Sequence, residues 1–314
     1  MTVSPLQVKA AATPRKPRRD VHGVLILDKP LGLTSNAALQ RVRTLFGARK
    51  AGHTGSLDPL ATGVLPICLG EATKLSGVLL DAPKRYRVSI VLGVTTTTGD
   101  AAGEVVECRP VNGISTQKVA AALATLQGEI QQVPPMYSAI KHQGQRLYTL
   151  AQQGIEVERA PRPVTVYEAR LLGVSEAVVE AEFHCSKGTY VRTLAEDLGA
   201  LLGCGAHVGA LRRIQAGIFG LDQAITLDAL TARAEQGFSA LDPLLITPGD
   251  ALADWPLVTL TADAARAVSQ GQAVTVAATS PSGRVRMFRA EGDFLGLGQV
   301  SDDRRLQPNR LLHL

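Results

Sequence analysis

The sequence has little cysteine. Its four cysteines, Cys68, Cys108, Cys185 and Cys204, lie far apart in the 314 residues and form no CxxC pair. A disulfide framework and a structural zinc site are therefore not expected, and a reducing cytoplasm is the default location. No run approaches the roughly 18 to 20 consecutive apolar residues that span a bilayer, and the first residues lack the apolar segment of a secretory signal. We expect neither a membrane partner nor export.

The net charge outside the first 20 residues is small. The chain carries 33 Lys and Arg against 28 Asp and Glu, a net charge of +5. Residues 1–20 hold five basic residues and only Asp20 among the acids, so just +1 remains for the rest of the chain. Residues 1–20 are predicted to form a disordered basic leader with a weak attraction to phosphates. A polyanion site elsewhere must come from local arrangement.

With 45% apolar and 19% charged residues, the sequence is typical of a globular protein of about two domains. From residue 21 to 250, strand and helix patterns alternate irregularly, which predicts a mixed sheet with helices packed on it. Strands are expected at 24–27, 86–94, 164–172, 177–185 and 207–217, and helices at about 36–47, 116–128, 146–153 and after 189. Residues 51–66 are expected to form a non-periodic loop that leads into a helix or strand.

The composition changes near 243–256, where proline, glycine and acidic residues gather. Beyond it, short segments separated by turn residues predict a compact β-rich second domain over 251–314. The core of so short a segment is small, so we expect this domain to pack on the larger one.

The segment AGHTGSLDPLATGVLP, residues 51–66, is the most informative. Pro59 biases Asp58 away from helical geometry, and Gly55 and Gly63 permit tight bends or a close approach to a ligand. A carboxylate among small and apolar neighbours needs a cation or hydrogen-bond donors to stay ionised. It can then act as a nucleophile or general base. The alternative is an Asx-type turn in which Asp58 only binds loop amides.

Other chemistries fit this segment poorly. His53 has no second His or Cys at metal-ligand spacing, so no metal site is expected. His53, Ser56 and Asp58 are too crowded in one short loop for a hydrolytic triad. The GxxxxGK[ST] and GxGxxG patterns of phosphate-binding loops are missing, so no nucleotide cofactor is expected.

Tyr86 alternates with basic residues in KRYR. On a strand, its ring could stack on a nucleic-acid base while the basic residues meet phosphates on the other face. The alternative is an edge strand with a core tyrosine. Leu211, which precedes two arginines, could belong to the core or to a pocket wall.

Tyr190 and Arg192 stand at the start of a predicted helix and can point into a pocket. Arg192 is a permanently charged donor that could pair with Asp58. The alternative is an ion pair with Glu196, one helical turn further on.

Together these segments resemble the TruB family of tRNA pseudouridine-55 synthases. The resemblance lies, in the family's order, in GVLILDKPLGLTS (23–35), GHTGSLDPLATGVLP (52–66), KRYRVSIVLGVTTTTGD (84–100), PPMYSAIKHQGQRLY (134–148), SKGTYVRTLAEDLG (186–199) and ALRRIQAG (210–217). Ser56 stands where threonine is common. The resemblance implies the α+β pseudouridine synthase fold, a mixed, largely antiparallel sheet flanked by helices. It also implies a PUA-like RNA-binding domain at 251–314.

The same resemblance implies isomerisation of uridine to pseudouridine in the T loop of tRNA, at position 55, after the base has been flipped out. Asp58 matches the catalytic aspartate, and Arg192 matches the cation paired with it. The substrate-binding matches are Tyr86, which stacks on the target base, Tyr190 and Leu211, which line the uracil pocket, and His53, at the disrupted T loop. No redox change or group transfer occurs, so no cofactor or metal is implied.

Two other functions remain open. A non-catalytic tRNA-binding or tRNA-folding protein could use the same pocket, although it would not need a carboxylate that repels phosphate. A phosphotransferase or hydrolase lacks the expected motifs. The Asp58 step could be direct attack at C1′ or removal of the C2′ proton to give a glycal. We expect a monomer, because no sustained heptads or exposed apolar stripe stands out.

Overall fold

The computed structural model describes residues 18–314. The predicted leader, 1–20, therefore lies outside the described residues except for its last three. Of these, Arg19 already contacts the folded body: its backbone N–H donates to the carbonyl of Gly47, and its guanidinium pairs with Asp242 and stacks 4.0 Å from the ring of Phe238. Contacts with the body thus begin before the predicted boundary at residue 21.

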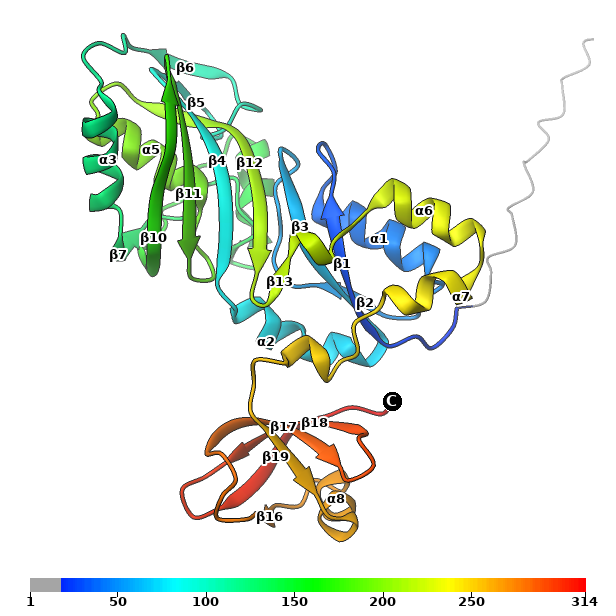
Figure 1. The fold of residues 1–314 in the computed structure, drawn as a ribbon. Helices are drawn as coiled ribbons and strands as arrows, with labels where there is room; N and C mark the ends of the chain where they lie inside the picture. The colour runs from blue at the N-terminus through cyan, green and yellow to red at the C-terminus, as the bar shows by residue number, and fades with distance from the viewer. Residues whose placement is uncertain (1–17) are drawn as a thin grey trace, which may run out of the picture.

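A ten-stranded sheet runs through the larger part of the molecule (Figure 1). Its order is β14-β1-β3-β12-β4-β11-β10-β7, with β2 beside β3 and β13 beside β12. The β1–β14 and β3–β12 pairs are parallel and the others are antiparallel, which confirms the mixed, largely antiparallel sheet. The strands are β1 (Gly23–Lys29), β2 (Ala51–His53), β3 (Ala61–Leu69), β4 (Lys84–Leu92), β7 (Gly128–Gln132), β10 (Arg162–Ser175), β11 (Val178–Cys185), β12 (Ala206–Ala216), β13 (Phe219–Gly220) and β14 (Ile225–Thr226).

Helices cover this sheet in two groups (Figure 1). One group, α1 (Ser35–Leu45), α6 (Leu227–Glu235) and α7 (Phe238–Leu241), lies near β1. The other, α3 (Thr116–Thr125) and α5 (Val191–Leu201), packs on β10 and β12. The apolar faces of α1, α3, α5 and α6 share one core with the strands, so these helices lie on the same face. The spacing of apolar residues at three and four positions predicted this burial.

Residues 51–66 do contain a loop that leads into a strand, but the loop is shorter than predicted. Strand β2 occupies the start, β3 begins at residue 61, and the loop proper is 54–60. β3 lies between β1 and β12 and is buried almost throughout, so its sequence lacks the polar alternation of a half-exposed strand. Gly63, with a φ of +103°, also lies within this strand, and a glycine inside a strand weakens the sequence signal for it.

Strand β1 is likewise buried on both sides. Leu25 and Leu27 face the helical core, whereas Val24 and Ile26 face a second cluster. The second cluster joins this sheet to the C-terminal strands through Leu297 and other apolar side chains. The C-terminal segment therefore does pack on the larger sheet.

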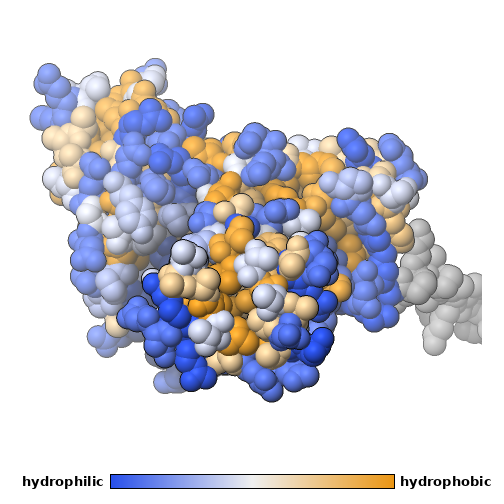
Figure 2. Space-filling model, turned by 60° about the horizontal axis from the view of Figure 1, so that its bottom comes forward, coloured by the Kyte–Doolittle hydropathy of each residue, from blue (hydrophilic) through white to orange (hydrophobic). Residues whose placement is uncertain are grey.

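The C-terminal segment forms a five-stranded sheet in the order β15-β17-β18-β19-β16. Its elements are β15 (Leu257–Leu260), α8 (Ala262–Ser269), β16 (Val274–Thr275), β17 (Gly283–Arg289), β18 (Phe294–Val300) and β19 (Arg305–Leu311). Buried Arg286 fastens it to the preceding linker by donating to the carbonyls of Gly249, Ala253 and Trp255. Figure 2 brings this part forward and shows hydrophobic residues near its centre with hydrophilic residues along its lower margin.

Smaller elements complete the larger part. Two short hairpins, β5 (Val94–Thr96) with β6 (Val105–Cys108) and β8 (Lys141–His142) with β9 (Gln145–Arg146), extend from the sheet. The remaining helical turns are α2 (Ser76–Asp81), α4 (Leu147–Gln152), and the 3-10 helices η1 (Gly70–Leu75), η2 (Leu221–Gln223), η3 (Asp242–Leu244) and η4 (Asp250–Leu252). Among the described helices, none has the length and apolar character needed to cross a membrane.

Candidate active site

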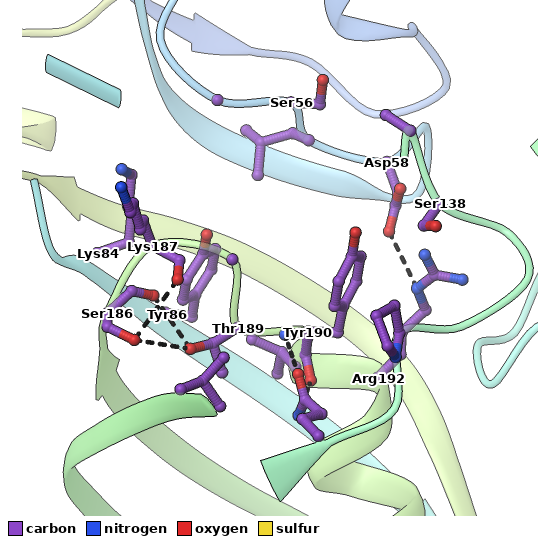
Figure 3. A pocket seen from close by; sticks show the side chains of 18 of the residues that line it. Ser56, Asp58, Lys84, Tyr86, Ser138, Ser186, Lys187, Thr189, Tyr190 and Arg192 are labelled. Carbon is purple, nitrogen blue, oxygen red and sulfur yellow. Dashed lines mark hydrogen bonds and ion pairs between the residues drawn. The ribbon is translucent and has the colours of Figure 1, made fainter. Parts of the chain in front are cut away.

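A cavity of about 580 Å³ lies where the 54–60 loop, strands β4 and β12 and the start of α5 meet. Five of the six predicted site residues line it: Asp58, Tyr86, Tyr190, Arg192 and Leu211. They come from four separate parts of the sequence, so the fold brings them together. Figure 3 shows Asp58 and Arg192 at one end of the cavity, with the rings of Tyr86 and Tyr190 along it.

The loop that carries Asp58 is held from both sides. The hydroxyl of Ser35, at the start of α1, accepts from the N–H of Leu57 at 2.7 Å and donates to its carbonyl at 2.9 Å. The carbonyl of Asp58 accepts from the N–H of Ala61 at 3.0 Å, which closes the turn into β3. These backbone bonds leave the carboxylate of Asp58 free to face the cavity.

The carboxylate of Asp58 pairs with Arg192: Oδ2 lies 3.0 Å from Nε. The other guanidinium nitrogens donate to the carbonyls of Thr98, at 2.9 Å, and Tyr137, at 2.7 Å. A second carboxylate, Asp100, lies 3.9 Å from the same Nε. Arg192 is therefore fixed by four partners, with its side chain only 5% exposed.

These contacts decide between the alternatives for Asp58 and Arg192. In the described part of the chain, the Asp58 side chain accepts no loop amide, so an Asx turn is not its role. Arg192 likewise pairs with Asp58 and Asp100, and no ion pair joins it to Glu196 within residues 18–314.

Two opposing effects act on the pKa of Asp58. Burial in the cavity raises it, because the charged form loses hydration. The positive charges of Arg192 and, more weakly, Lys29 lower it, while the negative charge of Asp100 raises it. The resulting pKa lies above the ordinary aspartate value, and the ion pair with Arg192 favours the ionised carboxylate.

Tyr86 and Leu211 come from neighbouring interior strands. β4 is paired on both sides, with β11 and β12, so the edge-strand alternative for Tyr86 is wrong. Leu211, 9% exposed, lies on β12 and lines the same cavity. Tyr86 and Leu211 thus present an aromatic and an aliphatic surface in the cavity, and a flat ligand can pack against both.

The start of α5 is clamped by a side chain that sequence reasoning missed. Buried Gln132, at the end of β7, accepts from the N–H of Tyr190 at 2.7 Å and donates to its carbonyl at 3.1 Å. This pair of bonds sets where the Tyr190 ring and the first turn of α5 enter the cavity. The two glutamines before VPP, of which Gln132 is the second, gave no signal of this role.

His53 does not line the cavity. It lies on β2, paired with Ile67 of β3, and its buried Nδ1 has no hydrogen-bond partner among the described residues. Burial lowers its pKa, and the charges of Arg213 and Arg146 lower it further. The His53 imidazole thus has an unsatisfied ring nitrogen and lies within the influence of the cations Arg213 and Arg146.

Three buried cations in or beside the site were also missed: Lys29, Lys84 and Arg213 are 0%, 5% and 1% exposed. Lys84 and Arg213 line the cavity. Lys29 donates to the carbonyls of Pro30 and Leu33 and shapes the turn after β1. Basic residues are usually exposed, so their presence in the sequence did not indicate burial.

Within residues 18–314, no three His, Cys, Asp or Glu side chains gather in a way that could hold a metal ion.

Known families and proteins match this chain over most of its length. The TruB family pseudouridylate synthase N-terminal domain matches residues 43–191. The tRNA pseudouridylate synthase B C-terminal domain matches 192–252, and the C-terminal domain of pseudouridine synthase II TruB matches 256–312.

Individual relatives agree. The tRNA pseudouridine synthase B of Nitrosococcus oceani is 56% identical over 294 residues, 94% of this chain and 96% of the relative. That of Ectopseudomonas mendocina is 54% identical over 297 residues, with 94% and 97% covered. A crystal structure of a Cbf5-Nop10-Gar1 complex contains a chain with a TM-score of 0.71 and 26% identity, covering 92% of this chain and 84% of that one. The chain belongs to the TruB family of pseudouridine synthases.

Proposed function

We propose that the protein isomerises uridine to pseudouridine in the T loop of tRNA, at position 55, and that Asp58 initiates the reaction. The supporting observation is the Asp58–Arg192 ion pair, 3.0 Å long, at the wall of a cavity that also presents Tyr86 and Leu211. The family membership gives the reaction type, and the names of the relatives suggest tRNA as the substrate.

Asp58 would act on the ribose of the target nucleotide. Direct attack at C1′ and removal of the C2′ proton both need an ionised carboxylate in nearly the same place. Arg192 supplies the charge that favours this state, and its bonds to two carbonyls fix its position. The uracil is then released, rotates and forms a new bond from C5 to C1′.

The target base must leave the RNA stack before it can enter the cavity. Stacking on an aromatic side chain is worth about 1–3 kcal/mol per base, which would offset part of the lost stacking. Tyr86 would supply this face, with Tyr190 and Leu211 as walls. We assign His53, outside the cavity, to the disrupted T loop that the base leaves.

We further propose that residues 21–250 form the catalytic domain and 251–314 a PUA-like RNA-binding domain. The basic leader would add salt-sensitive attraction to phosphates. A tRNA substrate favours the cytoplasm as the site of action, and the enzyme would act as a monomer.

Tritium release tests the proposal. A tRNA transcript labelled with [5-³H]uridine should release tritium with the wild type and none with Asp58→Asn. Asp228→Asn, at an exposed position of α6 outside the cavity, is the matched control and should behave like the wild type. A transcript with cytidine at position 55 should release none.

Two results of this experiment would contradict the proposal in different ways. Tight tRNA binding without release by the wild type would favour the alternative, a tRNA-binding or tRNA-folding protein. Release from the cytidine-55 transcript would keep the reaction but move the target uridine elsewhere.

A further inference from the structure

The cavity has two chemically different ends. Figure 3 shows Asp58, Ser138 and Arg192 at one end and Lys84, Lys187, Ser186 and Thr189 at the other, with the Tyr86 ring beside the second group. Buried Arg213 also lines the cavity and influences the pKa of both Tyr86 and Lys84, so it lies near the second end. The second end is rich in cations and is not used by the Asp58 step.

Lys84 and Arg213 are buried cations without a carboxylate partner. No ion pair in the described part of the chain includes either of them, although their exposed fractions are only 5% and 1%. Lys84 donates to the carbonyls of Leu80 and Ala82, and Arg213 to those of Val64 and Gly55. Neutral carbonyls satisfy hydrogen bonds but do not balance charge, so two desolvated positive charges remain.

Desolvation acts on Lys84 strongly. It lowers the pKa of Lys84 to about 8, and the neighbouring charge of Arg213 contributes to the lowering. An anion bound beside Lys84 would oppose both effects. Lys187, in contrast, is exposed and already paired with Asp81 at 2.7 Å.

Gly55 keeps the space between the two cations open. A Cβ at this position would lie 3.6 Å from Nη1 of Arg213 and 3.8 Å from Cε of Lys84. Its φ of +113° also disfavours any residue with a side chain. The backbone therefore leaves room against both cations, on the cavity wall that Tyr86 shares.

The proposed reaction produces an anion that fits this end. When the N1–C1′ bond breaks, its electron pair stays on N1, and resonance spreads the charge onto O2 and O4 of uracil. In the glycal route Asp58 takes the C2′ proton and later returns it; in the direct route an Asp58 oxygen bonds to C1′. In both routes C5 then supplies the electron pair for the new bond to C1′; in the direct route this breaks the bond between C1′ and the Asp58 oxygen and returns its electron pair to the carboxylate. C5 loses its proton to solvent, and N1 takes up a proton.

We propose that Lys84 and Arg213 form the binding site for the uracil anion released on glycosidic cleavage, an inference that rests on the proposed function. Fixed cations in a water-poor site stabilise charge that develops during a reaction far better than water does. Asp58 and the cations then act at opposite ends of one nucleotide: the carboxylate acts on the ribose, and the cations hold the departing base.

A leaving-group comparison tests this. Two transcripts carry uridine or 5-fluorouridine at the target position, and single-turnover loss of the original nucleoside is followed by chromatography after nuclease digestion. Fluorine makes the uracil anion intrinsically more stable, so it needs less help from the protein. Lys84→Met should slow the uridine reaction about 100-fold and the 5-fluorouridine reaction less than about 10-fold. The exposed Lys118→Met on α3 should leave the ratio of the two rates unchanged.

The ratio of the two rates guards against a folding artefact. Both reactions are measured on one preparation, so partial unfolding of Lys84→Met slows them alike. An equal fall for the two substrates would overturn the proposal and make Lys84 a packing residue.

A binding measurement needs no catalysis. Barbiturate is a uracil-like ring that is anionic at neutral pH, whereas uracil is neutral. The full-length protein should bind barbiturate more tightly than uracil, and Lys84→Met should weaken barbiturate about tenfold, or roughly 1.4 kcal/mol, with little effect on uracil. Unchanged barbiturate binding, or its displacement by inorganic phosphate alone, would contradict a base-anion site. Barbiturate binding that depends on Lys84 without tritium release would instead contradict the proposed function.

Discussion

Nη2 of Arg192 donates a 2.7 Å hydrogen bond to the backbone carbonyl of Tyr137. The same guanidinium pairs with Asp58 through Nε, so one buried side chain joins the Asp58 loop to the segment that leads into the β8–β9 hairpin. That segment also lines the cavity through Pro134, Ser138, Ala139 and Ile140. The position of this wall and the position of the carboxylate are therefore linked.

Loss of this link should loosen the hairpin. In Arg192→Met, trypsin should cut after Lys141 and Arg146 about fivefold faster, as expected when one hydrogen bond worth roughly 1 kcal/mol is removed from a local opening equilibrium. Timed digestion with mass spectrometry measures the two cleavages. Arg212→Met is the control, because Arg212 pairs with Asp28 and not with the hairpin. Equal cleavage in the two variants would show that Arg192 does not hold this segment.

The pH profile should report the same ion pair. Burial raises the pKa of Asp58 and Arg192 lowers it, so removal of Arg192 leaves the raising effect opposed only by the weaker influence of Lys29. If the ionised carboxylate is the active form, the acidic limb of the rate profile moves to higher pH in Arg192→Met. Single-turnover tritium release across the acidic range checks this. An unshifted limb with a lower plateau would mean that Arg192 acts on position alone.

The aromatic ring of Tyr86, rather than its hydroxyl, should determine its contribution to the reaction rate. Tyr86→Phe keeps the stacking face, whereas Tyr86→Ala should lose about 1–3 kcal/mol, or roughly 5- to 150-fold, in the interaction with the flipped base. Single-turnover rates with both variants measure this difference. Tyr167→Ala, at an exposed position of β10, serves as control. A rate for Tyr86→Ala equal to that of Tyr86→Phe would remove the ring from the proposed function.

Gly63 should tolerate no side chain. It has a φ of +103°, and a Cβ would lie 2.1 Å from the carbonyl oxygen of Arg213 on the adjacent β12 strand. Gly63→Ala should therefore destabilise the protein by more than about 1 kcal/mol, since strain and a backbone clash add. Gly77→Ala, in α2 with open space around it, should stabilise by about 0.5–1 kcal/mol. Denaturant unfolding of the two variants compares them, and similar midpoints would contradict the close approach.

The local elements were largely predictable. The helix near 36–47 and the strand near 86–94 follow from short-range spacing, and the structure places them at Ser35–Leu45 and Lys84–Leu92. The hydroxyl of Thr34 caps this helix by accepting from the N–H of Ala37, whereas the neighbouring hydroxyl of Ser35 holds the loop at Leu57. Spacing predicts a cap within one residue but not which hydroxyl has another partner available.

The chemical inventory of the site was also present in the sequence: a carboxylate before proline, an arginine at a helix start and a tyrosine among basic residues. These patterns indicated Asp58, Arg192 and Tyr86 because each residue type restricts its own backbone or carries fixed charge. The motifs that resemble the TruB family also lie in order along the chain. Sequence alone could therefore predict the family, its fold and its reaction.

Only the tertiary structure decided which side chains are buried together. β3 lies between β1 and β12, which explains why residues 61–66 lacked a strand pattern, and β2 carries His53 away from the cavity lining. Lys84 and Arg213 are ordinary basic residues in the sequence and become desolvated cations through strands that meet in space. Local sequence sets the conformation of each segment, whereas burial and charge pairing depend on contacts between segments far apart in the chain.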